Sequence, residues 1–317
     1  MDVVVAEEVP YLSDGDGQRM SYGIREHRLS SGARDFIHRS SIRTAGPPTT
    51  LRLRCPRERV GRWQLRTWRA EVIRRVAHPG RGFTQGLIAD DGTLYESTGR
   101  YGASALCRYP LGADRAEQRA GVPAEYFAEG ICRVGDVIWQ LTWRERTALK
   151  WDAATLELID RMPYNREGWG MCAAGDYVVT SDGSSELVRR DPQTLQAQAV
   201  IHVRCAGDRL QGLNDLAWSA GTIWASEAGT IWANVAGTHY LAGIDPDSGE
   251  VTDVVNARAA RERHIGNPQA IMTGIAALPG DGEFLLTGKG WRSIRHVRLK
   301  LARDKAALDR VLGGLAR

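Results

Sequence analysis

The feature that most constrains the fold is a pattern that recurs five times along the chain. In each copy a glycine turn leads into a short apolar and aromatic segment: DGTLYESTG (91–99), GDVIWQLTW (135–143), GDYVVTSDG (175–183), AGTIWANV (228–235) and DGEFLLTGKGW (281–291). The turn glycines recur at intervals of about 40 to 54 residues, and they are Gly92, Gly135, Gly175, Gly229 and Gly282. Self-similarity at this period is typical of architectures in which each repeat is one small sheet.

Two more segments accompany each glycine turn. The preceding segments are FTQGLIA (83–89), FAEGICR (127–133), REGWGMC (166–172), GLNDLAW (212–218) and MTGIAAL (272–278). The middle three following segments read as strand, Asp-containing turn and strand, the chemistry of a hairpin. Each unit therefore predicts four antiparallel strands, or one propeller blade. The sequence predicts an all-β, five-bladed β-propeller over 67–301, in which residues 67–76 complete the last blade. A β-sandwich is the alternative.

The two ends of the chain carry weaker structural signals than the repeats do. Residues 1–66 form an Arg-rich leader that we expect to be disordered or to reflect a misassigned start, and 302–317 form a short tail that could be helical. The arginines of 51–81 indicate either an arm that binds nucleic acid or a solvated leader. We favour the leader, and no nucleic-acid partner, because no aromatic-basic alternation suited to base stacking follows. The N-terminus shows no secretory signal, and no apolar run is long enough to span a membrane.

The five cysteines are odd in number and form no CxxC pair, so neither a metal cluster nor a dense disulfide framework is expected. We interpret most of them as small buried hydrophobic residues.

Polar residues stand near the start of each predicted innermost strand. They are Gln85, Glu129, Glu167, Asn214 and Thr273. Aromatic residues and one cation stand beside the same motifs, namely Phe83, Trp143, Trp169, Trp291 and Lys289. Innermost strands line the channel of a propeller, so we expect these side chains to gather at one mouth, where aromatic walls suit a small polar ligand. A low local dielectric would raise the pKa of a carboxylate toward the range of proton transfer. Packing in the core is the alternative role for the tryptophans.

The motifs GFTQGL, LYESTGRYG, YFAEGI, IWQLTWR, YNREGWGM, SDGSSEL, LND, IWANV and LLTGKGW occur in this order over residues 68–300. Together they resemble the plant-type glutaminyl cyclases, or glutaminyl-peptide cyclotransferases, which also occur in bacteria. The resemblance implies a five-bladed propeller that converts the N-terminal glutamine of peptides or proteins to pyroglutamate and releases ammonia. It implies an enzyme that needs no metal for its chemistry, although a structural cation would be compatible, and we expect a monomer. Members of the family are usually exported, whereas this chain shows no signal peptide as written.

The resemblance also implies roles for individual residues. Glu129 is the expected proton shuttle, with Asn214 and Lys289 as the other catalytic residues. The expected substrate-binding residues are Gln85, Phe83, Trp143 and Trp169, followed by Glu96 and Glu167 for binding of the substrate amine or support of the network.

The chain departs from the family pattern in its last two repeats. It has LNDLA, with Asp215 and Ala217, where the family often has LNELE, and TGIA, with Thr273, where the family has NGIA. Ala236 replaces a pocket tryptophan, and a duplicated AGTIWA could supply a substitute through Trp224 or Trp232. These departures leave open a catalytically impaired propeller that binds peptide N-termini or another small ligand, and an interaction scaffold.

Overall fold

The computed structural model describes residues 4–10, 22–28, 65–79, 82–220, 229–262, 270–280 and 282–302. The chain divides into two compact units, 1–58 and 59–317. Within the first unit, β1 (Val4–Pro10) and β2 (Tyr22–Arg28) form an antiparallel hairpin. Most other residues of the predicted leader, and nearly all of the predicted C-terminal tail, lie outside the described residues. No helix occurs in the described ranges, and hence none that could cross a membrane.

The second unit contains three four-stranded antiparallel sheets. They consist of β4 (Thr84–Asp90), β5 (Thr93–Thr98), β6 (Ala105–Pro110) and β7 (Gln118–Gly121); β8 (Ala128–Val134), β9 (Val137–Thr142), β10 (Thr147–Asp152) and β11 (Leu158–Pro163); and β12 (Met171–Ala174), β13 (Tyr177–Ser181), β14 (Glu186–Arg190) and β15 (Ala197–His202). A short hairpin of two-residue strands, β16 (Arg204–Cys205) and β17 (Asp208–Arg209), follows.

The rest of the unit is one eight-stranded sheet. Its strands, in spatial order, are β18 (Leu213–Ser219), β19 (Thr230–Val235), β20 (Tyr240–Ile244), β21 (Val251–Asn256), β3 (Arg66–Ala77), β24 (Ser293–Leu301), β23 (Glu283–Gly288) and β22 (Met272–Ala277). Every pairing is antiparallel except that of β21 with β3. Because β3 pairs with β24 along most of its length, the prediction that 67–76 completes the last sheet is confirmed.

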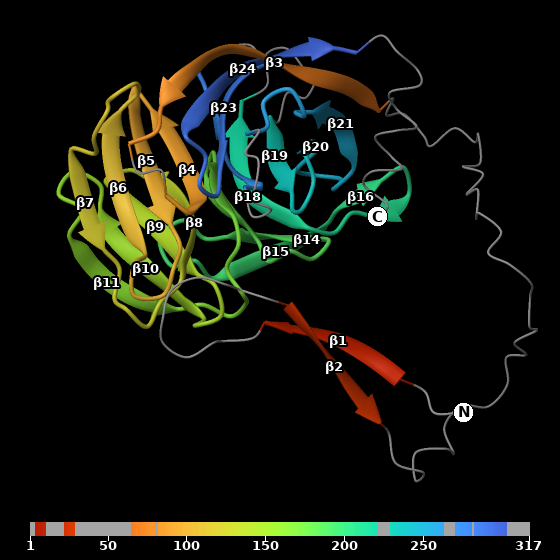
Figure 1. Ribbon diagram of the computed structural model, residues 1–317, viewed down its shortest axis with the longest axis horizontal. Helices are drawn as coiled ribbons and strands as arrows, with labels where there is room; N and C mark the ends of the chain where they lie inside the picture. Colours follow the sequence, from red (N-terminus) through yellow and green to blue (C-terminus); the bar gives the residue numbers. More distant parts are fainter. Residues whose placement is uncertain are drawn as a thin grey trace, which may run out of the picture. The chain divides into compact units, whose positions relative to one another are not determined.

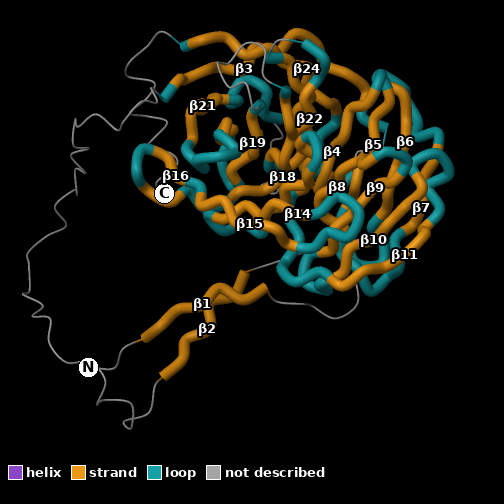
Figure 2. The backbone as a smooth tube through the Cα atoms, turned by 180° about the vertical axis from the view of Figure 1, so that it is seen from behind, coloured by secondary structure: helices purple, strands orange, loops and turns teal. Residues whose placement is uncertain are grey.

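One end strand of each four-stranded sheet and both end strands of the eight-stranded sheet face a common centre, where Figures 1 and 2 label β4, β8 and β18. Strand β4 contacts β8, β8 contacts β12, β12 contacts β18, β18 contacts β22, and β22 returns to β4. Hydrophobic clusters fill the spaces between neighbouring sheets and between the two halves of the eight-stranded sheet. The fold is therefore all-β and propeller-like.

The turn chemistry follows the sequence. All five repeat glycines adopt the left-handed conformation that glycine favours, with φ between 58° and 85°. In the predicted Asp turns, one carboxylate oxygen accepts hydrogen bonds from two backbone N–H groups of the same turn; the residues are Asp152, Asp191 and Asp245.

The prediction that most cysteines are small buried residues is also confirmed. Cys107, Cys132, Cys172 and Cys205 are buried and free, and Cys55 lies outside the described residues.

The junction between β21 and β3 depends on Asp253. Its carboxylate accepts hydrogen bonds from Arg66 Nε and Nη2, both at 2.7 Å, and from Trp68 Nε1 at 2.7 Å. We expect Asp253→Asn to lower the free energy of unfolding by about 2–4 kcal/mol, because an amide has one acceptor oxygen and turns an NH₂ group toward buried donors. Urea unfolding measures this. Asp208→Asn, in the exposed β17, is the control, and equal stability of both variants would contradict the prediction.

Candidate active site

The innermost strands are irregular near their first residues. Register shifts interrupt the pairing at the start of β4, β8, β18 and β22. Such bulges leave a residue unpaired and redirect its side chain. The residues at the shifts include four of the predicted polar residues, Gln85, Glu129, Asn214 and Thr273. The bulges therefore explain how a strand that lines the core can direct a polar side chain toward the end of the channel.

A glycine follows most of these positions because the inner strands approach one another closely. A Cβ atom on Gly86 would lie 2.8 Å from the backbone nitrogen of Ile131, and one on Gly130 would lie 2.7 Å from the Cα of Gly170. A Cβ on Gly170 would lie 2.0 Å from the carbonyl oxygen of Asn214. The repeated residue-glycine motif is therefore a packing requirement of the channel wall.

The third strand differs from the prediction. The residue before Gly170 is Trp169, so Trp169 holds the place of Gln85 and Glu129, and the proposed equivalence of Glu167 was wrong by two positions. The Glu167 carboxylate is half exposed, lies 3.5 Å from Arg144 Nε, and accepts a hydrogen bond of 3.4 Å from Trp169 Nε1. Glu167 therefore lies at the rim and orients the indole ring.

Glu129 is the buried carboxylate of the site. Gln85 Nε2 donates a hydrogen bond of 2.7 Å to Glu129 Oε1. Burial raises the pKa of Glu129 well above its usual range; the Lys289 ammonium and the Gln85 hydrogen bond lower it, and the Asp215 and Glu145 carboxylates raise it further. A carboxyl group with a raised pKa can both accept and return a proton near neutral pH.

Two hydrogen-bond donors among the predicted residues have no hydrogen-bond partner in the described ranges: the Lys289 ammonium, which is close enough to Glu129 to lower its pKa, and the Asn214 side-chain amide. Lys289 pairs through its backbone with Phe83, and its Nζ lies 4.6 Å from the centre of the Phe83 ring. Burial lowers the pKa of Lys289, and Glu129 partly offsets this. Free donors of this kind suit a developing negative charge on a substrate oxygen.

An aromatic cluster lies beside these groups, with Phe127 at its centre. Its ring centroid lies 6.2 Å from that of Phe83, 5.6 Å from that of Trp143 and 5.4 Å from that of Tyr101. The sequence analysis missed Phe127, although a signal existed: Phe127 precedes Glu129 by two residues, as Phe83 precedes Gln85.

Several predicted residues serve the packing of the sheets. Glu96 is fully buried, and its carboxylate lies 2.8 Å from His78 Nε2. It also accepts hydrogen bonds from the hydroxyl groups of Thr84 and Tyr109, at 2.6 and 2.7 Å. Of the two roles predicted for Glu96, these contacts favour support of the network over binding of the substrate amine. Trp291 is fully buried in the core and does not form a wall of the mouth. The Thr273 hydroxyl donates to the Thr84 carbonyl at 2.6 Å.

Trp232, one of the two predicted substitutes for the missing tryptophan at Ala236, does not restore a wall of the mouth. It lies in β19, which pairs with β18 from Val235 with Leu213 to Thr230 with Ser219. Trp232 is fully buried, with its ring 5.2 Å from that of Phe284, and Trp224 lies outside the described residues.

Asp215 is a residue whose importance the sequence analysis missed. It stands where β4, β8 and β22 have a glycine after the bulge, and that break in the pattern was the available signal. Its side chain is fully buried, and Oδ2 accepts the Ile275 backbone N–H at 3.0 Å, whereas Oδ1 has no partner within the described ranges. Burial raises the pKa of Asp215 well above its usual range. Asp215 thus places a second carboxyl group close enough to influence Glu129.

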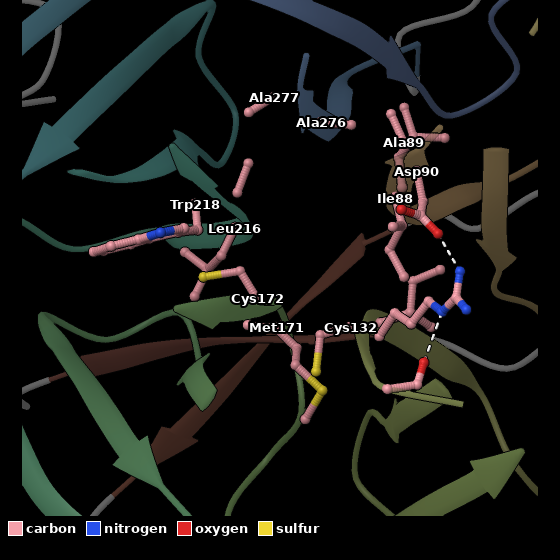
Figure 3. Close-up of a pocket in the computed structure, with 16 residues that line it drawn as sticks. Ile88, Ala89, Asp90, Cys132, Met171, Cys172, Leu216, Trp218, Ala276 and Ala277 are labelled. Atoms are coloured by element: carbon pink, nitrogen blue, oxygen red, sulfur yellow. Dashed lines mark hydrogen bonds and ion pairs between the residues drawn. The ribbon is translucent and has the colours of Figure 1, made fainter. Parts of the chain in front are cut away.

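A cavity of about 440 Å³ lies at the opposite end of the inner strands (Figure 3). Leu216, Met171, Cys132 and Ala276 are among the residues that line it. Arg133, which also lines it, is paired with Asp90. The buried carboxylate and the free donors of the candidate site lie at the other end.

The fold and the candidate site define a propeller-like protein in which a buried carboxyl group and an aromatic cluster lie together. Comparison with known proteins identifies the family: the model of the glutamine cyclotransferase family matches residues 53–299, and the chain belongs to that family. The chain is 30% identical over 241 residues to a glutaminyl-peptide cyclotransferase of Arabidopsis thaliana, covering 74% of this chain and 73% of the relative. It also resembles the crystal structure of Myxococcus xanthus glutaminyl cyclase, with a TM-score of 0.68 and 30% identity, covering 75% of this chain and 100% of that one.

Proposed function

We propose that this chain converts the N-terminal glutamine of peptides or proteins to pyroglutamate. The α-amino nitrogen attacks the side-chain carboxamide carbon, a ring C–N bond forms, and the original C–N bond breaks to release ammonia. One proton must leave the attacking amine, and one must reach the departing nitrogen. A single carboxyl group near both nitrogens can accept the first proton and deliver one to the departing nitrogen.

The observation that supports this proposal most strongly is the arrangement around Glu129. Its carboxyl group is buried and has a raised pKa, as a proton shuttle near neutral pH requires. In our proposal, Lys289 and Asn214 donate to the carboxamide oxygen as negative charge develops there, and Gln85 orients Glu129. Phe83, Trp143 and Trp169 form the walls around the substrate side chain, and Glu167 supports Trp169. These roles require no metal ion.

We further propose that the eight-stranded sheet is two blades joined edge to edge, so that the propeller has five. Strands β18–β21 would form one blade, and β22, β23, β24 and β3 the other. The parallel contact of β21 with β3 involves four residue pairs, whereas all other pairings within the sheet are antiparallel. The closed ring of inner strands supports this division.

The deciding experiment is to incubate the purified full chain with an amidated peptide that begins with glutamine and to measure ammonia release and loss of the free amine. We expect turnover with this peptide and none with the same peptide beginning with alanine. Well-folded protein that releases no ammonia but binds the glutamine peptide would instead identify a binding protein.

Lys289→Met should change the pH dependence of turnover. A neighbouring cation favours the ionised carboxylate and lowers its pKa, so removal of the cation raises the pKa of Glu129. The acidic limb of the kcat/KM profile, which reports the base in the free enzyme, should therefore move to higher pH. Steady-state rates across the pH range measure this shift.

Asp215→Asn provides a comparison of opposite sign. The Asp215 carboxylate raises the pKa of Glu129, so its neutralisation should move the acidic limb to lower pH. Shifts of both variants in the same direction would contradict the assignment of this limb to Glu129.

A further inference from the structure

A groove of about 260 Å³ adjoins the candidate active site and runs outward across the first sheet. It begins at Phe83, whose ring belongs to the aromatic cluster, and reaches Arg119 in β7, the outermost strand of that sheet. Gly82, Thr98, Arg100, Ala103 and Gly290 also line it. The groove therefore connects the rim of the site with the outer edge of the first sheet.

The groove shares a wall with the catalytic groups. Phe83 forms a backbone bridge with Lys289, and the backbone nitrogen of Gly290, the next residue, donates to the Gly82 carbonyl at 2.9 Å. A peptide with its first residue at Glu129 must extend out of the site along some surface. The groove offers a path that begins at a wall of the site.

Two arginines give the groove an uncompensated positive charge. The Arg100 guanidinium carbon lies 5.0 Å from the centre of the Phe83 ring, and Arg119 Nη2 donates to the Ala103 carbonyl at 3.3 Å. Neither guanidinium is paired with a carboxylate among the described residues. Both side chains are exposed, so an incoming ligand can reach them. Guanidinium groups bind carboxylates through paired hydrogen bonds, which makes an anion the favoured occupant.

We propose that this groove is a subsite for an acidic side chain just after the N-terminal glutamine of the substrate, with Arg100 and Arg119 as the residues that select it. The inference rests on the proposed function, because it assumes that the peptide begins at Glu129. It assigns a substrate preference, for peptides with Asp or Glu near the N-terminus, to residues outside the catalytic group.

The test compares matched peptides with a blocked C-terminus. Amidated Gln-Glu-Ala and Gln-Ala-Glu carry the acid at the second and third positions, and Gln-Gln-Ala and Gln-Ala-Gln are their neutral counterparts of nearly equal shape. Amidation removes the C-terminal carboxylate, and repeating the neutral peptides with a free C-terminus shows whether that group can use the same subsite. The readout is the ratio of kcat/KM for acidic over neutral peptide.

We expect a ratio of about threefold or more at one of the two positions, since each exposed ion pair contributes only modestly to binding. The ratio should fall toward one in Arg100→Gln and Arg119→Gln and at high salt. Arg115→Gln is the matched control, because Arg115 is an exposed residue in the connection of β6 and β7 outside the groove, and it should keep the ratio.

Turnover of all peptides with a ratio near one, or a ratio that Arg100→Gln and Arg119→Gln both leave unchanged, would overturn the subsite and leave the proposed function intact. Absence of turnover with every peptide would overturn the proposed function. In that case, equilibrium binding of the same peptides tests the subsite, and equal affinity for acidic and neutral peptides would reject it.

Discussion

Glu129→Gln is expected to reduce the rate of pyroglutamate formation by at least about 100-fold, the range typical of lost acid–base catalysis. Glutamine keeps the size of the side chain and can accept the 2.7 Å hydrogen bond from Gln85 through its amide oxygen. It cannot take a proton from the attacking amine or deliver one to the leaving nitrogen. The loss should therefore appear in kcat, whereas peptide binding should change little.

Two controls separate this effect from misfolding. The thermal unfolding temperature of Glu129→Gln should stay at or above that of the parent, because the substitution removes a buried acid whose ionised form is costly to bury. Glu157→Gln, an exposed residue in a turn, should leave the rate unchanged. A Glu129→Gln variant that turns over at nearly the parental rate would remove Glu129 from its proposed role.

The repeated pattern predicted the fold well because it consists of local signals. Left-handed glycines and Asp-containing turns are specified by a few neighbouring residues, so their spacing in the sequence predicts the four-strand unit and the closing strand β3. By contrast, Asp253 and Arg66, which join β21 to β3, are 187 positions apart in the sequence. No local pattern encodes such a contact.

The sequence predicted most residues of the candidate site, but it did not predict which position of each inner strand carries the site residue. The sequence identified Gln85, Glu129 and Asn214 near the starts of the innermost strands, and the bulges place them there. It misplaced Glu167 by two residues, because Trp169, directly before the close-packed Gly170, holds the equivalent position, and β12 pairs in regular register only from Met171 onward. Trp291 is fully buried in the core, whereas Trp169 is only partly buried. The sequence did not distinguish them, because burial depends on which sheet packs against each ring.

The close approach of the inner strands explains why glycine is required beside the proposed catalytic residues. Gly170 packs against the backbone that carries Asn214: an added Cβ atom would lie 2.0 Å from the Asn214 carbonyl oxygen and 2.8 Å from the Cα of Asp215. Both are backbone atoms of the next inner strand, so rotation of a side chain cannot relieve the overlap. The two strands would have to separate, which would also displace Asn214 and Asp215.

We therefore expect Gly170→Ala to lower the free energy of unfolding by about 3 kcal/mol or more, at the upper end of the cost of overpacking a core. The folded fraction should also lose activity, because Asn214 moves away from the substrate oxygen. Gly121→Ala in β7 is the matched control: a Cβ there meets no atom within 4 Å, so the change should be nearly neutral. Urea unfolding and turnover of both variants measure the two effects. Equal stability of Gly170→Ala and Gly121→Ala would show that the inner strands can separate at little cost, and that close backbone packing does not hold the site together.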